Sequence, residues 1–386
     1  MARVIGIICE YNPFHKGHKY QIDKIKSIEK DATIVAIMSG NVVQRGEFSI
    51  IDKYSRTKMA LECGVDGVFE MPYPYCGSTA EIFASAGVEI AAKLGCNAIY
   101  FGVEQASIAE LEAIAEIIDS PEFDRVLRNE MENKSTSYIL AKEKALSKLG
   151  ACLPKCANDM LGIEYIRSIR KKGINLEYYG IQRKGSFYND NSVGTIMSAS
   201  AIRNNFYETD SFMSVPTETL KIYDEIIDKK SYLDIKNVNR LLHSYILLNG
   251  DNLLKAFDTS PEMVALINQC AKDSENFIEC LSSKIFTTAR LKRAILYAIF
   301  DIKKVDSKPK YTFLLGADKK GREYLNELKR KTKFPIITKH SDVKHLNKAQ
   351  KEQLEKSYLV DSIYNMLLKN PKVPSDAYKQ KPIIKE

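Results

Sequence analysis

The sequence predicts an α/β protein in which a parallel sheet with helices on both faces is followed by a mainly helical second part. Short runs rich in Val and Ile, each bounded by loop residues, predict buried strands at 3–9, 32–38, 66–71 and 97–102. Apolar residues at near-helical spacing lie between these runs. Such alternation of strand and helix is typical of a parallel sheet buried on both faces.

The remaining elements follow in order. Helical spacing covers 17–30, 52–63, 80–94 and 160–172, and a further strand is predicted at 176–182. Beyond a break at Val215-Pro216, long amphipathic helices are predicted at 218–229, 237–249, 261–280 and 287–302. Strand signals there are confined to 311–316 and 334–339, and the proline-containing stretch 370–386 is expected to be frayed. We therefore expect one domain over 1–215 and a helical, basic domain over 216–386.

Composition excludes several classes of protein. The chain has 386 residues, of which 45% are hydrophobic and 27% charged, so extensive disorder is excluded. No apolar run reaches the roughly eighteen residues of a membrane span, and the N-terminal segment lacks a signal-peptide cleavage site. Eight cysteines without a CxxC pair fit free thiols in a reducing cytosol. We therefore expect a cytoplasmic protein without membrane contact.

Positive charge is concentrated in one segment. The whole chain has a formal charge of +8, whereas residues 284–333 contain 15 Lys and Arg against five Asp and Glu. The rest of the chain is therefore slightly acidic. This asymmetry favours a polyanionic partner such as nucleic acid, although a solvated basic face is the alternative.

The predicted first strand runs directly into the segment EYNPFHKGHKY, residues 10–20. In an open α/β sheet, ligands bind beyond the carboxyl ends of the strands. His15 and His18 share one face of the first turn of the following helix, and Gly17 leaves bare backbone between them. Two imidazoles at a helix N-terminus suit a triphosphate, so we expect a nucleotide site. The P-loop and GxGxxG fingerprints are absent.

A second segment, SASAIR at 198–203, has the same character. Ser200 can cap a helix and hydrogen-bond phosphate, and Arg203, one turn further on, can bind phosphate oxygens with its guanidinium. The alternative is an ordinary N-cap beside a surface arginine.

These segments resemble the two signatures of the HxGH nucleotidyltransferase superfamily, HxGH and a Ser-rich turn ending in Ile-Arg. The order of further motifs resembles the bacterial tRNA(Met) cytidine acetate ligases over nearly the whole chain. The motifs are ICEYNPFHKGH (8–18), SGNVVQRGE (39–47), DKYSRTKMAL (52–61), NDMLGIEY (158–165), YGIQRKGSFYND (179–190), SASAIR (198–203), TTARLKRAIL (287–296) and LLGADKKGREYL (314–325).

The resemblance implies a Rossmann-like nucleotidyltransferase domain and a reaction in two steps. Acetate attacks the α-phosphate of ATP, which gives acetyl-adenylate and pyrophosphate. The acetyl group then passes to N4 of the wobble cytidine in elongator tRNA(Met). No enzyme nucleophile is needed, so catalysis would depend on positioning and charge stabilisation.

The resemblance also implies site residues. The catalytic residues would be His15, His18, Ser200 and Arg203. The ATP site would contain Ile7, Glu10, Tyr11, Asn12, Pro13, Phe14, His15, Lys16, Gly17, His18, Tyr20, Gly102, Asn158, Arg183 and Lys184.

Local alternatives remain for several of these residues. Gly102 also fits a strand-end turn, Asn158 fits an ordinary N-cap, and Arg183 with Lys184 fits solvated surface. A polar cluster after the second strand divides between pocket and scaffold; its members are Gln44, Arg45, Glu47, Asp52, Lys53 and Arg56. Asn189 stands where the family pattern has His. Mg²⁺ is expected to arrive with ATP, since no cluster at metal-ligand spacing announces a protein-held metal.

The basic segment is the predicted tRNA contact. We expect Arg290, Lys292 and Arg293 to project from a helix, with Lys319, Lys320 and Arg322 nearby and Lys329–Lys333 lining a groove that follows phosphates. Tyr297, Tyr311 and Tyr324 lie among these basic residues, and packing in the core is favoured for each over stacking on RNA bases. Two other functions remain open: a small-molecule nucleotidyltransferase, and a non-catalytic ATP-sensing RNA-binding protein.

Overall fold

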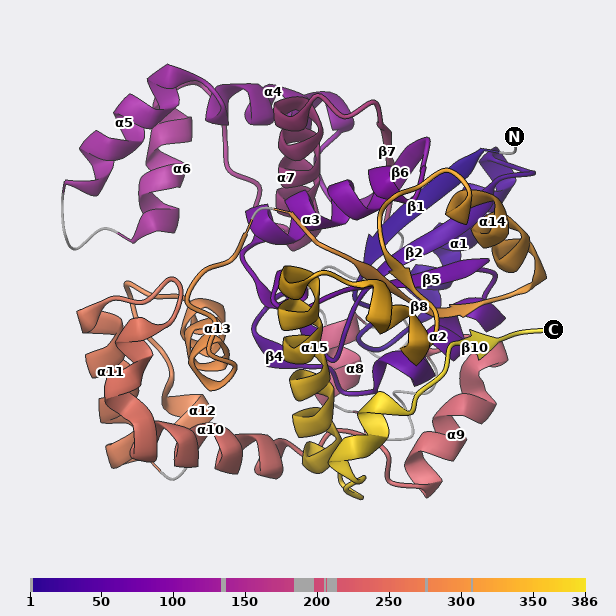
Figure 1. Cartoon of the computed structure of the whole chain (residues 1–386). Helices are drawn as coiled ribbons and strands as arrows, with labels where there is room; N and C mark the ends of the chain where they lie inside the picture. Colours follow the sequence, from indigo (N-terminus) through magenta and orange to yellow (C-terminus); the bar gives the residue numbers. More distant parts are fainter. Residues whose placement is uncertain are drawn as a thin grey trace.

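A mixed sheet forms the centre of the computed structural model, which describes residues 3–132, 137–183, 198–204, 206, 214–274, 277–306 and 308–386. The eight strands lie in the order β10-β8-β5-β2-β1-β6-β7, and β9 pairs with β8 (Figure 1). Their bounds are β1 Val4–Cys9, β2 Thr33–Ser39, β5 Gly67–Met71, β6 Ala98–Val103, β7 Glu177–Gln182, β8 Thr312–Ala317, β9 Ile336–Ile337 and β10 Ile383–Ile384. A separate hairpin pairs β3 (Val42–Val43) with β4 (Glu47–Phe48).

The predicted parallel sheet is confirmed. All neighbours from β5 through β2, β1 and β6 to β7 are parallel. In chain order this is the 3-2-1-4-5 arrangement of doubly wound folds. Right-handed crossovers put α1 (Lys16–Ile28) and α2 (Lys53–Glu62) on one face, and α3 (Ala80–Lys93) and α7 (Ala157–Lys172) on the other. The strand order therefore reverses between β1 and β6.

Further helices surround this sheet. A group inserted between β6 and α7, with no counterpart among the sequence-based predictions, contains α4 (Ile108–Ile118), α5 (Pro121–Met131) and α6 (Tyr138–Lys148). The later helices are α8 (Ala199–Asn204), α9 (Leu220–Asp228), α10 (Ile235–Asn249), α11 (Pro261–Asp273), α12 (Phe277–Cys280), α13 (Thr288–Ile299), α14 (Lys319–Lys329) and α15 (Lys348–Leu367). The single helix expected over 261–280 is thus two helices. No described helix is both long and apolar enough for a membrane span.

The sheet draws strands from both sides of residue 215. β8 runs antiparallel to β5, and β10 pairs with β8 through Ile383 and Gly316. The expected fraying of 370–386 is therefore wrong for β10, which is held by its sheet neighbour. One apolar core includes residues from both sides of residue 215. The division into two domains at residue 215 therefore remains a prediction, which is based on the change in sequence pattern there.

Candidate active site

A cavity of about 340 Å³ opens beyond the carboxyl ends of β1 and β6, where the strand order reverses. Twelve of the residues expected for the site line it: Glu10, Tyr11, Asn12, His15, Gly17, His18, Tyr20, Gly102, Asn158, Arg183, Ser200 and Arg203. Four others do not line it, namely Ile7, Pro13, Phe14 and Lys16. Ile7 and Phe14 are buried in the core instead. Lys184 and Asn189 lie outside the described residues.

The two histidines form the N-terminus of α1. His15 is the N-cap, and its Nδ1 accepts a hydrogen bond from the Gly17 amide at 3.0 Å. The Nδ1 of His18 accepts from the His15 amide at 3.3 Å, and the two rings stack with centroids 3.7 Å apart. Because each Nδ1 is an acceptor, each neutral ring carries its proton on Nε2. Both imidazoles can therefore donate a hydrogen bond from Nε2.

Burial keeps both rings neutral. It lowers the pKa of His15 to about 3, with further lowering by the charges of Arg183 and Arg203. Burial also lowers the pKa of His18 well below its usual value, assisted by His15 and Arg183. The imidazoles thus act as neutral hydrogen-bond donors, and the positive charge at the cavity comes from arginines.

The loop between β1 and α1 is fixed from several sides. Arg56 is fully buried and donates to the carbonyls of Glu10 and Gly40, each at 2.5 Å. The Asn12 side chain accepts from the Ile50 amide at 2.8 Å. Hydrogen bonds from buried donors hold this loop in one conformation, so the histidines are placed before any ligand arrives.

The polar cluster after β2 divides between pocket and scaffold. Gln44, Arg45 and Glu47 line the cavity. Asp52 caps α2, Arg56 holds the loop, and Lys53 lies in a buried ion-pair cluster. In that cluster the Lys53 Nζ is 2.8 Å from Glu70 Oε2 and 2.6 Å from Asp361 Oδ2.

The second signature meets the first at this cavity. Arg203 donates to the Asn12 carbonyl at 2.7 Å and to the Ser200 hydroxyl at 3.1 Å. The expected cap is corrected: Ser198, and not Ser200, accepts from the Ala201 amide. Ser200 lies one turn before Arg203, where its hydroxyl and the guanidinium both border the cavity.

The part of the cavity wall formed by Asn158 and Arg183 depends on two carboxylates that the sequence analysis missed. Glu104 pairs with Arg183 at 3.2 Å and accepts from the Asn158 side chain. Asp159 accepts from the amides of residues 104–106. Asn158 is in the first turn of α7, where Cys156 is the N-cap, so it is not an ordinary cap. The sequence offered one indication of these carboxylates, because Asp159 directly follows the predicted site residue Asn158.

The basic residues predicted to contact tRNA divide into two groups. Those on α13 are used inside the protein: Arg290 pairs with Asp258, Lys292 pairs with Glu47, and Arg293 is buried. The expected outward projection of Arg293 is therefore wrong, because its guanidinium donates to the Gln44 carbonyl. On α14, Lys319 and Arg322 are exposed, and Lys320 donates to the Ala32 carbonyl at 2.6 Å. Tyr297 and Tyr311 are buried as expected.

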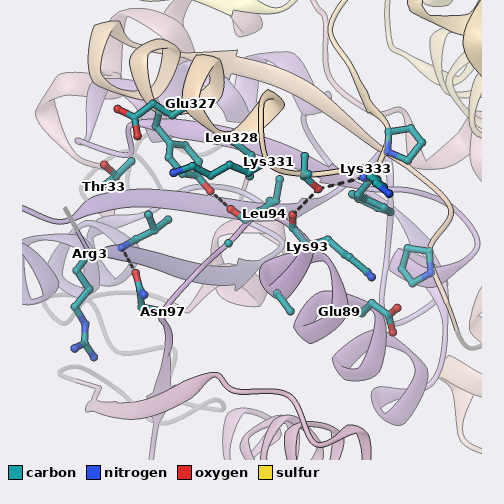
Figure 2. Close-up of a pocket in the computed structure, with 18 of the residues that line it drawn as sticks. Arg3, Thr33, Glu89, Lys93, Leu94, Asn97, Glu327, Leu328, Lys331 and Lys333 are labelled. Atoms are coloured by element: carbon teal, nitrogen blue, oxygen red, sulfur yellow. Dashed lines mark hydrogen bonds between the residues drawn. The ribbon is translucent and has the colours of Figure 1, made fainter. Parts of the chain in front are cut away.

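A larger cavity of about 1090 Å³ lies elsewhere, between the end of α3 and α14 (Figure 2). It contains no histidine, and lysines and glutamates make up much of its lining. Within the described ranges, no three His, Cys, Asp or Glu side chains gather as metal ligands. The smaller cavity, by contrast, is lined by two imidazoles and several guanidiniums. These groups suit a nucleotide triphosphate, so the smaller cavity is the candidate active site.

Comparisons with known proteins agree with this class of site. Residues 2–380 match the model of the HIGH Nucleotidyl Transferase family. The chain therefore belongs to that family.

Close relatives define the branch more narrowly. A tRNA(Met) cytidine acetate ligase of Thermoanaerobacter sp. (strain X514) is 34% identical over 96% of both chains. One from Thermosipho africanus is 36% identical over 95% of this chain and 96% of its own. TmcAL of Thermotoga maritima bound with alpha-thio ATP superposes with a TM-score of 0.89 at 29% identity over 99% of each chain. Its apo form gives 0.91 at 30%, also over 99% of each. Within the HIGH family, the chain is thus a member of the tRNA(Met) cytidine acetate ligases.

Proposed function

We propose that this chain joins acetate to the wobble cytidine of elongator tRNA(Met) at the expense of ATP. A carboxylate oxygen of acetate attacks the α-phosphorus of ATP, and pyrophosphate leaves. The N4 amine of the cytidine then attacks the acyl carbon, the bond to AMP breaks, and the amine loses a proton. The main support is the pair of neutral imidazoles, each with its proton on Nε2, that line the cavity at the strand reversal.

The site residues have distinct proposed roles. His15 and His18 donate to phosphate oxygens as charge develops during attack on the α-phosphorus. Arg203, with Ser200, borders the same cavity and is bonded to the Asn12 carbonyl in the loop before His15, and it neutralises the leaving pyrophosphate. Asn158, Arg183 and Gly102 line the part of the cavity that we assign to the adenosine, and a Cβ at residue 102 would crowd Arg183 Cγ at 3.3 Å.

Mg²⁺ fits this proposal as a companion of the nucleotide. The cavity-lining carboxylates among the described residues are Glu10, which accepts from the Gln44 amide, and Glu47, which pairs with Lys292. Triphosphate oxygens would therefore supply most of its ligands, and the ion would neutralise phosphate charge. A cytoplasmic location, expected from the cysteines, is part of the same proposal.

ATP–pyrophosphate exchange tests the first step. Purified protein should exchange labelled pyrophosphate into ATP only when acetate is present, and labelled acetate should enter elongator tRNA(Met) when ATP is added. Exchange that needs another small acid or amine would favour a small-molecule nucleotidyltransferase. ATP binding without exchange under any condition would favour a non-catalytic sensor.

A further inference from the structure

The larger cavity is a groove with a surplus of cations. We call it the basic groove and define it by the lysines that line it: Lys93, Lys308, Lys310, Lys320, Lys331 and Lys333. Arg3 adds a seventh cation, and four glutamates, Glu89, Glu177, Glu323 and Glu327, also line it. The lysines come from three segments: the end of α3, and, more than 200 residues later, the approach to β8 and the stretch from α14 to β9 on either side of that strand.

Three of these cations have no acidic partner among the described residues. Arg3 pairs with Glu177, and Lys310 pairs with Asp306. Lys93, Lys308 and Lys333 are exposed, and none takes part in an ion pair with any described carboxylate. Their charge is therefore available to a ligand, unlike the charge of Arg290 and Lys292 on α13.

The backbone that carries these lysines is fixed. The Tyr324 hydroxyl donates to the Leu94 carbonyl, and the Thr332 hydroxyl donates to the Lys93 carbonyl at 3.2 Å (Figure 2). These bonds join the end of α3 to α14 and to the segment that holds Lys333. Flexible point charges on a fixed frame suit successive phosphates along a strand, because each ammonium can reach one phosphate without a set angle.

The basic groove is connected to the active site through one short segment. Tyr75 follows β5 and donates from its hydroxyl to the Lys308 carbonyl at 2.7 Å. Three residues later, the Ser78 carbonyl accepts from the side chain of Gln44, which lines the nucleotide cavity. This segment joins the Lys308 end of the groove to a wall residue of the active site, whereas the other end of the groove lies at the amino ends of β1 and β6, at Val4 and Asn97. Only a large polyanion that passes around the edge of the sheet, such as a folded RNA, can contact both.

We propose that the basic groove binds the phosphate backbone of the RNA substrate while one of its bases enters the active site. This inference rests on the proposed function, which makes a tRNA the polyanion of the reaction. It moves the RNA contact from α13, whose cations are already paired or buried, to lysines that the fold leaves exposed.

The experiment compares two triple variants of the full chain. The groove variant is Lys93→Ala, Lys308→Ala and Lys333→Ala. The control is Lys24→Ala, Lys58→Ala and Lys221→Ala, which removes three exposed lysines on α1, α2 and α9 that form no ion pair with a described carboxylate. Binding of elongator tRNA(Met) transcript is measured from about 0.05 to 0.2 M salt, together with acetate-dependent ATP–pyrophosphate exchange without RNA.

The groove variant should bind tRNA on the order of tenfold or more weakly, with a salt slope lower by about one per lysine. Its exchange rate should equal that of the wild type. Unchanged tRNA affinity, or an equal loss in the control triple, would overturn the proposal. Absence of acetate-dependent exchange in the wild type would instead contradict the proposed function, and the tRNA measurement would still decide the role of the groove.

Discussion

Two cationic regions of this chain use positive charge in opposite ways. Behind the active site, Arg56 and Lys53 are buried and surrounded by carbonyls and carboxylates. Along the basic groove, Lys93, Lys308 and Lys333 face solvent without acidic partners among the described residues. Buried cations are screened little by salt and fix geometry, whereas exposed cations act at a distance and weaken as salt rises. Substitutions in the first region should therefore change stability, and those in the second should change association.

The largest expected effect is on the buried cluster. Lys53→Met leaves Glu70 and Asp361 facing each other without a cation, which should lower the free energy of unfolding by about 3–5 kcal/mol. Burial and the neighbouring Asp361 already raise the pKa of Glu70, to about 7, although Lys53 opposes the shift. The loss should therefore be smaller at pH 5 than at pH 8, because the carboxyl can take a proton. Chemical denaturation at the two pH values measures this.

Lys58→Met on the same helix is the matched control for that substitution. Lys58 is exposed, so its replacement should change stability by less than about 0.5 kcal/mol. Equal losses of unfolding free energy for Lys53→Met and Lys58→Met would contradict the claim that burial makes a cation important for stability.

The second effect concerns chemistry. His18→Ala removes one Nε2–H donor from the cavity and should lower acetate-dependent exchange by about 10²–10³-fold. Because the imidazole is neutral, raising the salt concentration should not change this ratio. His345→Ala, an exposed histidine far along the chain, should leave exchange unaltered. If His18→Ala lowers the exchange rate by less than threefold, His18 is not a catalytic residue.

The third effect is the pH dependence of stability at His15. Its pKa falls from 6.5 to about 3 on folding, so below pH 6.5 the unfolded chain binds a proton that the folded chain does not. Stability from this group is therefore complete above pH 6.5 and is lost as pH falls toward 3. Between pH 6.5 and 5 the loss amounts to about 1.6 kcal/mol.

The variant His15→Gln should lack that portion of the acid sensitivity. Denaturation curves of both proteins at pH 6.5, 5.75 and 5 supply the two slopes. Identical slopes would show that the His15 ring takes up a proton in the folded state.

The smallest effect is expected on α13. Lys292 pairs with Glu47 at 2.6 Å, and the two side chains are 17% and 32% exposed. Lys292→Ala should cost less than about 1 kcal/mol of unfolding free energy. It should also leave the salt slope of tRNA binding unchanged, since this charge is already paired. A lower slope would return the RNA contact to α13.

Much of the fold could be predicted from local sequence. The strands β1, β2, β5 and β6 are short and mostly apolar, so their boundaries were found to within one or two residues. The group from α4 to α6 was missed, because α5 and α6 carry many charged residues and their apolar stripes are narrow. The pairing of β10 with β8 was missed because two residues give no periodicity.

The candidate site divides in the same way. His15, His18 and Arg203 lie within short motifs whose spacing reports helix geometry directly. Glu104 was not found, because its role depends on Asn158 and Arg183, which only the folded sheet brings beside it. The pairing of Arg290 with Asp258 and of Lys292 with Glu47 was equally invisible. The sequence of a basic segment gives its total charge. Tertiary contacts decide which of those charges remain unpaired and available to a ligand.

The contact between Lys53 and Asp361 also has a consequence for synthesis on the ribosome. Lys53 is translated 308 residues before Asp361. Asn41, which donates to the same carboxylate, is translated 320 residues before it. Until α15 leaves the ribosome, Lys53 and Glu70 are present without Asp361. This cluster therefore forms late in translation, when segments 308 and 320 residues apart in the chain first meet.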